Sequence, residues 1–394
     1  MLEHAIWWHV YPLGAVGAPI RTEHGDPAPR LRRLEAWLDY AVELGCNGLL
    51  LNPVFASVSH GYDTLDYYRV DPRLGDDADL DRLIAQCRDR GMLIVLDGVF
   101  NHVAREHPWV LARPDLIAHD DDGVPRAWEG HDSLVELDHA NPAVADLVVD
   151  IMGHWLRRGI AGWRLDVAYA VPAAFWRDVT ARVRAEFPDA VFLGEVIHGD
   201  YPAFVADAGL TTVTQYELWK AIWSSLKDTN LWELAHAIER HAAFCRSFLP
   251  QTFVGNHDVT RIASLVGAER AALAAGILML LPGSPSVYYG DEQGYAGIKR
   301  DELGGDDDVR PLLPPSPADL SPLGAPIHQA YRDAIGFRRR HPWLASGAVE
   351  VTARANERLA WRVTAGEQIC DVVLDLTAGT LVAVAADETL TIGA

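Results

Sequence analysis

The chain has 394 residues, of which 49% are hydrophobic and 23% charged. This balance is typical of a folded globular protein and excludes a disordered or collagen-like chain. The 34 Lys and Arg residues against 55 Asp and Glu residues give a formal net charge of −21, which argues against nucleic acid or an anionic membrane as the main partner and suits a neutral substrate.

The cysteines and the apolar segments indicate where the protein works. The four cysteines are far apart and form no CxxC pair, so we expect buried free thiols rather than a zinc or redox site. The first residues lack the basic start and the cleavage motif of a signal peptide, and the apolar stretch Ala271–Leu281 is too short to span a bilayer. Together these features predict a cytoplasmic protein that contacts no membrane.

Short apolar runs alternate with amphipathic segments along most of the chain. Near-continuous apolar runs are typical of strands covered on both faces, and their alternation with helices predicts a parallel sheet. The predicted strands are Ala5–Tyr11, Gly48–Leu51, Leu93–Asp97, Gly162–Val167, Val191–Glu195, Thr212–Tyr216, Thr252–Gly255 and Ser286–Tyr289. The predicted helices are Leu31–Leu44, Asp79–Arg90, Ala143–Arg158, Pro172–Phe187, Leu231–Phe244, Glu269–Leu280 and Ile327–Arg340. Eight strands of this kind predict an α/β fold, a closed (β/α)8 barrel.

Two segments depart from the alternation. His102–His139 is rich in Pro, Gly, Trp and charge and shows no clear helix, so we interpret it as a small excursion over the barrel mouth. Beyond residue 345, three segments, Glu350–Val363, Ile369–Leu376 and Leu381–Ile392, predict the strands of a small all-β domain. The predicted domains are therefore a barrel of residues 1–101 and 140–344, an excursion of residues 102–139, and a C-terminal domain of residues 345–394.

Polar side chains gather where the predicted strands end. In a parallel barrel these ends converge on one mouth, and they carry Asp97–His102, Arg164 with Asp166, Glu195, and Asn256–Asp258. Each motif alone also suits a strand end, an ion pair or a helix cap. Jointly they predict two carboxylates on neighbouring strands, with Arg164 favouring the ionised form of Asp166, as a retaining glycosidase requires.

These residues resemble the α-amylase family of glycoside hydrolases (glycoside hydrolase family 13). DGVFNH, GWRLDVA, GEV and VGNHD are similar to its four main motifs, and GYDTLDYYRVDPRLG is similar to the motif that follows strand 2. The resemblance covers the chain from about residue 5 to residue 340. Among its branches, GWRLDVA followed by GEVIH is most similar to the neopullulanase and cyclomaltodextrinase branch.

The resemblance implies a role for each matched residue. Asp166 corresponds to the nucleophile, Glu195 to the acid/base and Asp258 to the acid that stabilises the transition state. Arg164 corresponds to the arginine that orients the nucleophile, and the residues implied to contact the sugar are Tyr62, His102 and His257.

The segment GGDDDVRP, residues 304–311, is similar to a loop in which an Asp and an Arg hold the sugar on its non-reducing side. Asp308 and Arg310 are the expected counterparts. Aromatic residues near the predicted mouth are candidate platforms for sugar rings: Trp109, Trp128, Tyr216, Trp219 and Trp223.

Relatives in this family commonly bind a structural calcium ion through the motif containing Asn101 and an acid of a fifth motif. Here the fifth motif is LVELD, residues 134–138, and lacks the usual proline. We therefore expect no cofactor and no catalytic metal, with a structural calcium ion disfavoured.

The sequence thus predicts a retaining α-glycosidase that hydrolyses α-1,4-glucosidic bonds of maltooligosaccharides or cyclodextrins. One alternative is a transglycosylase or glucoside isomerase of the same family, because acceptor choice depends on loop shape. A more remote alternative is an inactive sugar-binding barrel, against which the presence of all three acids argues. The oligomeric state stays open.

Overall fold

The computed structural model describes residues 2–20, 27–302 and 304–393, and eight parallel strands form its centre. Their order is β11-β10-β9-β5-β2-β1-β13-β12, and a parallel bridge between Thr214 and Gln251 joins the two ends of this sheet. The strands are β1 (Trp7–Val10), β2 (Gly48–Leu51), β5 (Leu93–Gly98), β9 (Gly162–Leu165), β10 (Val191–Gly194), β11 (Thr212–Val213), β12 (Gln251–Phe253) and β13 (Ser284–Tyr288). All eight coincide with predicted strands, and the (β/α)8 barrel is confirmed.

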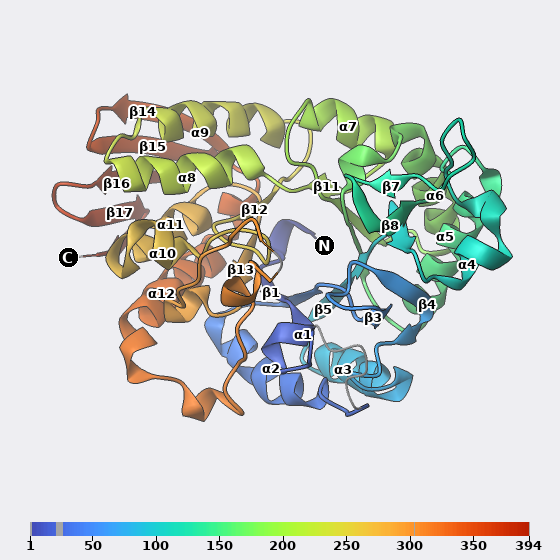
Figure 1. Ribbon diagram of the computed structural model, residues 1–394. Helices are drawn as coiled ribbons and strands as arrows, with labels where there is room; N and C mark the ends of the chain where they lie inside the picture. The colour runs from blue at the N-terminus through green and yellow to red at the C-terminus, as the bar shows by residue number, and fades with distance from the viewer. Residues whose placement is uncertain (1, 21–26, 303, 394) are drawn as a thin grey trace.

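Helices surround the barrel (Figure 1). They are α1 (Pro12–Ala15), α2 (Arg32–Leu44), α3 (Asp77–Asp89), α5 (Pro142–Arg157), α6 (Ala173–Glu186), α7 (Tyr201–Ala208), α8 (Tyr216–Asp228), α9 (Trp232–Cys245), α10 (Ile262–Val266), α11 (Ala268–Leu280) and α12 (Ala325–Arg340). Local chemistry sets their ends: Asp76 and Asp79 form a capping box at α3, and Gly45 ends α2 in the left-handed conformation with φ 103°. No helix among the described residues is long and apolar enough to cross a membrane.

The barrel interior changes from apolar to polar along β1. Trp7 packs with Ala5, Leu50 and Val95 in a small apolar cluster, whereas Trp8 belongs to the main core and stacks on Trp37 of α2 at 6.2 Å. Because side chains alternate along a strand, His9 follows Trp7 on the inner face. The polar layer that begins at His9 forms the floor of the site.

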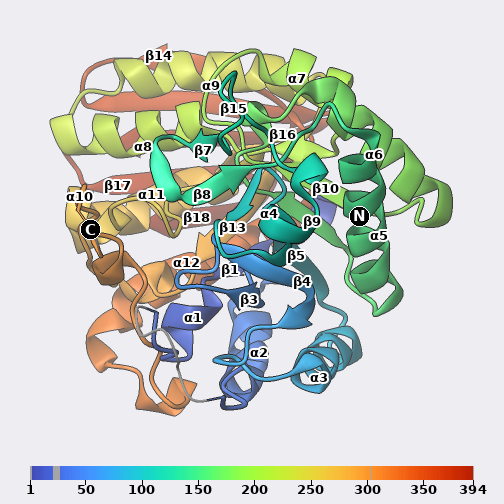
Figure 2. The same cartoon turned by 45° about the vertical axis from the view of Figure 1, so that its right-hand side comes forward.

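The segment after β5 forms its own small sheet. Strands β6 (His102–Ala104), β8 (His131–Glu136) and β7 (Ala127–Trp128) pair in that order, with the short helix α4 (Pro108–Ala112) between β6 and β7. The prediction of no helix here was wrong for α4, which Pro108 begins and His107 caps. The sheet packs beside β4 (Thr64–Val70), which forms a hairpin with β3 (Phe55–Ser57) (Figure 2). The domain boundaries at 101/102, 139/140 and 344/345 stay predictions.

The C-terminal residues form a five-stranded antiparallel sheet, which Figure 1 shows beside α9 and α11. Its strands are β14 (Ala348–Arg354), β15 (Arg358–Ala365), β16 (Gln368–Asp375), β17 (Thr380–Ala385) and β18 (Glu388–Ile392). Two of the three predicted strands were wrong in extent, because each is a hairpin. The turns at Asn356 and Ala386, the latter with φ 50°, use no glycine and gave no strong turn signal.

Candidate active site

Strand register brings the predicted acids together. Leu165 of β9 is paired with Gly194 of β10, so Asp166 and Glu195 follow at matching positions where the two strands end. On the other side of β9, Arg164 is paired with Asp97 of β5. The sequence therefore places three carboxylates and one guanidinium on three adjacent strands.

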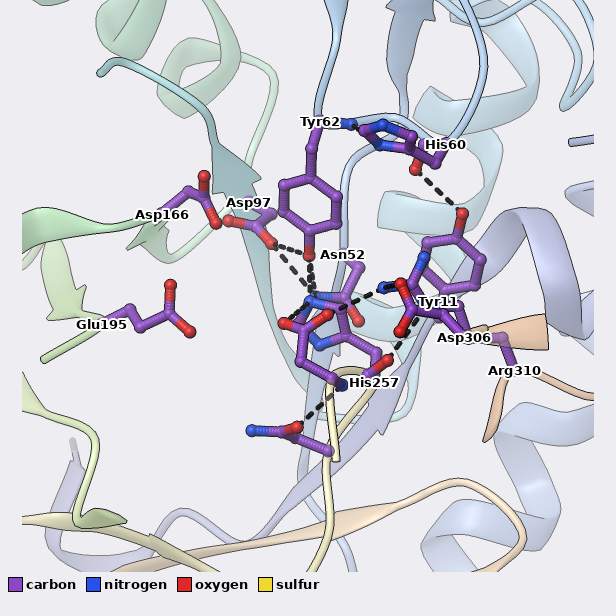
Figure 3. Close-up of polar contacts among 12 residues, drawn as sticks. Tyr11, Asn52, His60, Tyr62, Asp97, Asp166, Glu195, His257, Asp306 and Arg310 are labelled. Atoms are coloured by element: carbon purple, nitrogen blue, oxygen red, sulfur yellow. Dashed lines mark hydrogen bonds and ion pairs between the residues drawn. The ribbon is translucent and has the colours of Figure 1, made fainter. Parts of the chain in front are cut away.

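Arg164 binds all three of these carboxylates. Its Nη1 donates to both oxygens of Asp97 at 2.9 and 2.7 Å and to Oδ1 of Asp166 at 3.1 Å, and its Nη2 lies 2.9 Å from Oε1 of Glu195. Asp166 and Glu195 lie on the same side of the group drawn in Figure 3. One guanidinium thus fixes both carboxylates relative to each other.

The surroundings of Asp166 oppose its ionisation. Burial raises the pKa of the Asp166 carboxyl well above its ordinary value; Arg164 opposes the rise, and the carboxylates of Glu195 and Asp97 add to it. Arg164 thus favours the ionised form of Asp166, as the sequence predicted, and does so against the opposing effect of burial.

Glu195 is held by donors on both oxygens. The backbone N–H of Val167 donates to Oε2 at 3.0 Å, and the hydroxyl of Tyr216 donates to Oε1 at 3.1 Å. Val167 adopts the left-handed conformation with φ 39°, which is strained for a β-branched residue. The strained turn directly after Asp166 is what aims this amide at Glu195.

The third acid, Asp258, lies between two basic groups. Its Oδ2 is 2.8 Å from Nε2 of His257, and its Oδ1 accepts from Nη2 of Arg310 at 2.8 Å. Burial alone raises the pKa of the Asp258 carboxyl, but His257 and Arg310 outweigh it and hold that pKa well below its ordinary value. His257 and Arg310 therefore hold Asp258 in its ionised form.

The sugar-contact candidates lie around these acids. Tyr62 stacks on His257 with ring centres 5.3 Å apart, and its hydroxyl donates to Asp97 at 3.0 Å and contacts Nε2 of His257. The ring of His102 stacks on Trp128 of the excursion at 5.8 Å, and burial lowers the pKa of His102 to about 4. The imidazole of His102, the imidazole of His257 and the phenol of Tyr62 are groups that can hydrogen-bond the hydroxyl groups of a sugar.

The acid beside Arg310 is not the one expected. Asp308 pairs with Arg300 at 2.6 Å near the surface, whereas Asp306 lies 3.1 Å from Nη2 of Arg310. Arg310 also lies over the ring of Tyr11 at 4.6 Å, and Figure 3 shows Tyr11, Asp306 and Arg310 together on the side opposite Glu195. The geometry therefore favours Asp306 over Asp308 as the partner of Arg310; their spacing of four residues was the available signal.

Two further residues escaped sequence reasoning. Asn52, directly after β2, accepts from Nε2 of His9 at 2.9 Å and donates to Tyr62 at 2.8 Å and to Asp97 at 3.1 Å. Tyr11, directly after β1, donates to the carbonyl of His60 at 2.8 Å. Asn52 directly follows the predicted strand Gly48–Leu51, and Tyr11 is the last residue of the predicted strand Ala5–Tyr11; these positions were the signal for them.

The aromatic candidates divide into two groups. Trp128 lies against His102 and Tyr216 against Glu195, so both reach the site. Trp109 packs on Tyr67 at 5.7 Å, and Trp219 packs on Phe253 and Trp223. The contacts of Trp109, Trp219 and Trp223 are therefore packing contacts with other aromatic side chains.

The residues expected at a calcium site are engaged elsewhere. The amide of Asn101 lies 3.1 Å from Nδ1 of His102, and Glu136 of the fifth motif pairs with Arg126 at 2.6 Å. A guanidinium beside Glu136 opposes a cation at that place, so these residues do not fit calcium. Across residues 2–20, 27–302 and 304–393, no cluster of three or more His, Cys, Asp or Glu could hold a metal ion.

Comparisons with known proteins agree with this geometry. The model of the alpha amylase catalytic domain matches residues 25–116 and 128–360. A cyclomaltodextrinase of Geobacillus thermopakistaniensis is 27% identical over 95% of this chain and 69% of its own length, and an intracellular maltogenic amylase of Bacillus subtilis is 31% identical over 66% and 48%. Because the family model matches more than half of the chain, the chain belongs to the α-amylase family of glycoside hydrolases.

Solved structures share the whole architecture. The cyclic α-maltosyl-(1→6)-maltose hydrolase of Arthrobacter globiformis superposes with a TM-score of 0.84 at 23% identity, covering 99% of both chains. This likeness shows the fold, the C-terminal sheet included. The curated relatives are longer: the chain spans about half to 70% of their length.

Proposed function

We propose that the protein is a retaining α-glycosidase that hydrolyses α-1,4-glucosidic bonds of maltooligosaccharides or cyclodextrins. The observation that carries the proposal is the contact of Arg164 with both Asp166 and Glu195, at 3.1 and 2.9 Å, where β9 and β10 end. Two carboxylates held by one guanidinium suit a double displacement on a single glycosidic bond.

In the first step, Asp166 attacks the anomeric carbon while Glu195 protonates the leaving oxygen. The bond to the leaving sugar breaks as the ester bond to Asp166 forms, which gives a β-glycosyl-enzyme. Glu195, now a carboxylate, then removes a proton from water, whose oxygen displaces Asp166 and restores the α configuration. Asp258, held ionised by His257 and Arg310, stabilises the positive charge that develops at the anomeric carbon.

The substrate class is supported by the relatives, which are a cyclomaltodextrinase and maltogenic amylases. Tyr62, His102, His257 and Arg310 surround the acids as the binding groups for the reacting sugar, together with Asp306. No nucleic acid or membrane partner is proposed. The four free cysteines, of which Cys46, Cys87 and Cys370 are buried, support a cytoplasmic location.

The test is chromatography of the products from maltotriose, β-cyclodextrin and pullulan. We expect glucose and maltose from the native protein and a loss of at least about 10³-fold in rate for Asp166→Asn and Glu195→Gln. Longer or rearranged products would support transfer to sugar acceptors instead. Equal turnover by the native protein and Asp166→Asn would overturn the proposal.

A second experiment separates the two acids near Arg310. Asp306→Asn removes a charge 3.1 Å from Arg310, whereas Asp308→Asn removes one that contacts Arg300. We expect KM for maltotriose to rise about tenfold in the first variant, because one charge-assisted contact contributes about 1.5–3 kcal/mol, and to stay unchanged in the second. The reverse result would return Asp308 to the site.

We propose further that the protein needs no cofactor and no calcium ion, because Arg126 supplies the positive charge beside Glu136. Dialysis against EDTA is expected to leave the melting temperature and the hydrolysis rate unchanged. A fall in either that calcium restores would contradict this.

A further inference from the structure

The hydroxyl of Tyr216 contacts the proposed acid/base and takes no part in the steps described above. Tyr216 begins α8, is 9% exposed, and its ring packs edge-on against Phe253 at 4.9 Å and Trp219 at 5.7 Å. This packing fixes the orientation of the ring and therefore the position of the hydroxyl oxygen. The hydroxyl oxygen lies 3.1 Å from Oε1 of Glu195.

The direction of the Tyr216 hydroxyl follows from its other partner. The amide nitrogen of Asn256 donates to the Tyr216 oxygen at 2.9 Å, and the amide oxygen of Asn256 accepts from the backbone N–H of Asp258 at 2.9 Å. The second bond fixes which end of the amide faces Tyr216, because a backbone N–H can only donate. Tyr216 therefore receives a hydrogen bond from Asn256 and gives its own hydrogen to Glu195.

The donors around Glu195 are unequally divided between its oxygens. Oε1 receives Tyr216 at 3.1 Å and Arg164 at 2.9 Å, whereas among the residues that the structure describes Oε2 receives only the Val167 amide, at 3.0 Å. A carboxylate oxygen has two lone-pair positions, so two donors leave no position for a proton on Oε1. One position remains on Oε2.

We infer that Tyr216 is a positioning residue that, through its hydrogen bond to Oε1, restricts the catalytic proton of Glu195 to Oε2. This inference rests on the proposed function. Without the Tyr216 hydroxyl, Oε1 gains a free lone pair, and the proton divides between Oε1 and Oε2 instead of staying on Oε2. Protonation of the leaving group is the step that suffers.

The experiment compares Tyr216→Phe on two substrates that differ in their need for a proton. Maltotriose requires protonation of its leaving oxygen, whereas α-maltosyl fluoride releases fluoride without it. We expect kcat/KM, which reports the first step, to fall about 10–100-fold for maltotriose and less than about threefold for the fluoride. A merely structural role would lower both by the same factor.

Two more variants complete the test. In Asn256→Asp, the new carboxylate still accepts from the backbone N–H of Asp258, but it offers Tyr216 an acceptor in place of a donor. The Tyr216 hydroxyl then turns its hydrogen away from Glu195. We expect this variant, which keeps the tyrosine, to show the same substrate-dependent loss of kcat/KM as Tyr216→Phe. Tyr40→Phe, which removes a buried tyrosine hydroxyl bound to Glu292 at 2.9 Å, is expected to lower neither rate.

The outcomes separate this inference from the proposed function. The role of Tyr216 would be overturned if both Tyr216→Phe and Asn256→Asp lost kcat/KM equally on the two substrates, or lost none. The proposed function would still stand in that case, provided that Asp166→Asn and Glu195→Gln are inactive. Activity in Asp166→Asn would instead remove the proposed function itself.

Discussion

The barrel contains the same hydrogen-bonded triple twice, once in the site and once away from it. In the site, Asn256 donates to Tyr216, which donates to Glu195. In the second triple, Gln293 donates to Tyr40 of α2 at 2.5 Å, and Tyr40 donates to Glu292 at 2.9 Å. Each triple is a side-chain amide, a phenol and a carboxylate.

The two triples differ in what else contacts the carboxylate. Oε1 of Glu195 is also bound by Arg164, whereas Glu292 has the backbone N–H of Gly290 at 2.9 Å as its further donor, and the nearby Arg261 pairs with Asp291. Burial raises the pKa of Glu292 to about 7, although Tyr40 and the backbone donor oppose the rise. Tyrosine and amide alone therefore do not keep a buried carboxylate ionised.

Both carboxylates have a tyrosine and an amide, so the comparison teaches that contact with a guanidinium and a place at the end of a barrel strand are what set Glu195 apart. Glu292 is fully buried and joins α2 to the segment after β13, so it contributes to packing. Glu195 is 5% exposed and lies where β10 ends, so a substrate can reach it. Changes to the cluster around Glu195 should therefore lower activity, whereas changes to the cluster around Glu292 should lower stability with little effect on activity.

The largest effect is expected from the two buried arginines. Arg164→Met leaves the carboxylates of Asp97, Asp166 and Glu195 without their cation, whereas Arg261→Met leaves only Asp291. Each variant should lose about 3–5 kcal/mol of unfolding free energy, because removing one partner strands a buried charge. Activity per folded molecule should fall at least about 10³-fold for Arg164→Met and stay near the native value for Arg261→Met.

Urea unfolding and rates on maltotriose, corrected for the folded fraction, measure both quantities. Equal losses of activity in the two arginine variants would remove the distinction between the clusters.

The next effect is a pH dependence of stability from Glu292. Its pKa is raised from the ordinary 4.5 to about 7 in the folded protein, so the unfolded chain loses this proton first. The stabilisation is complete below about pH 4.5 and is lost as pH rises through 7, a change of up to about 3 kcal/mol. Glu292→Gln should flatten the fall in unfolding free energy between pH 5 and pH 8.

The control for this measurement is Glu186→Gln, which changes an exposed carboxylate paired with Arg157. It should keep the native slope of stability against pH. If Glu292→Gln kept the native slope of unfolding free energy against pH, Glu292 would not be the cause of the pH dependence.

The sequence predicted the barrel and the acids for one physical reason. Strands that are covered on both faces consist mainly of apolar residues. The end of such a strand can therefore be recognised in the sequence as the position where polar residues begin. Asp97, Asp166, Glu195 and Asp258 all lie at or just beyond such points, and parallel register then brings them to one mouth.

What the sequence did not predict depends on local geometry without a strong pattern. The choice between Asp306 and Asp308 is made by the short 3-10 turn Asp307–Val309, which leaves Asp306 beside Arg310 and turns Asp308 towards Arg300. Helix α8 was missed, and its first residue, Tyr216, was assigned to the end of the predicted strand Thr212–Tyr216. The direction of the Tyr216 hydroxyl follows from contacts between three separate elements, which no spacing in the sequence records.

The smallest effect, and the closest test of the comparison, is the stability of Tyr40→Phe against that of Tyr216→Phe. Removing the Tyr40 hydroxyl leaves the amide of Gln293 and Oε1 of Glu292 buried without that partner, and we expect a loss of about 1–2 kcal/mol. The loss should be larger at pH 8 than at pH 5, because the ionised carboxylate needs the donor more than the protonated one does. Tyr216→Phe also leaves the amide of Asn256 without that partner, but Glu195 keeps Arg164 and the Val167 amide, so we expect a loss of about 1 kcal/mol that is the same at both pH values. Thermal unfolding at pH 5 and pH 8 measures the stability loss of each variant at each pH. If Tyr216→Phe were as unstable and as pH-dependent as Tyr40→Phe, both hydroxyls would serve packing alone.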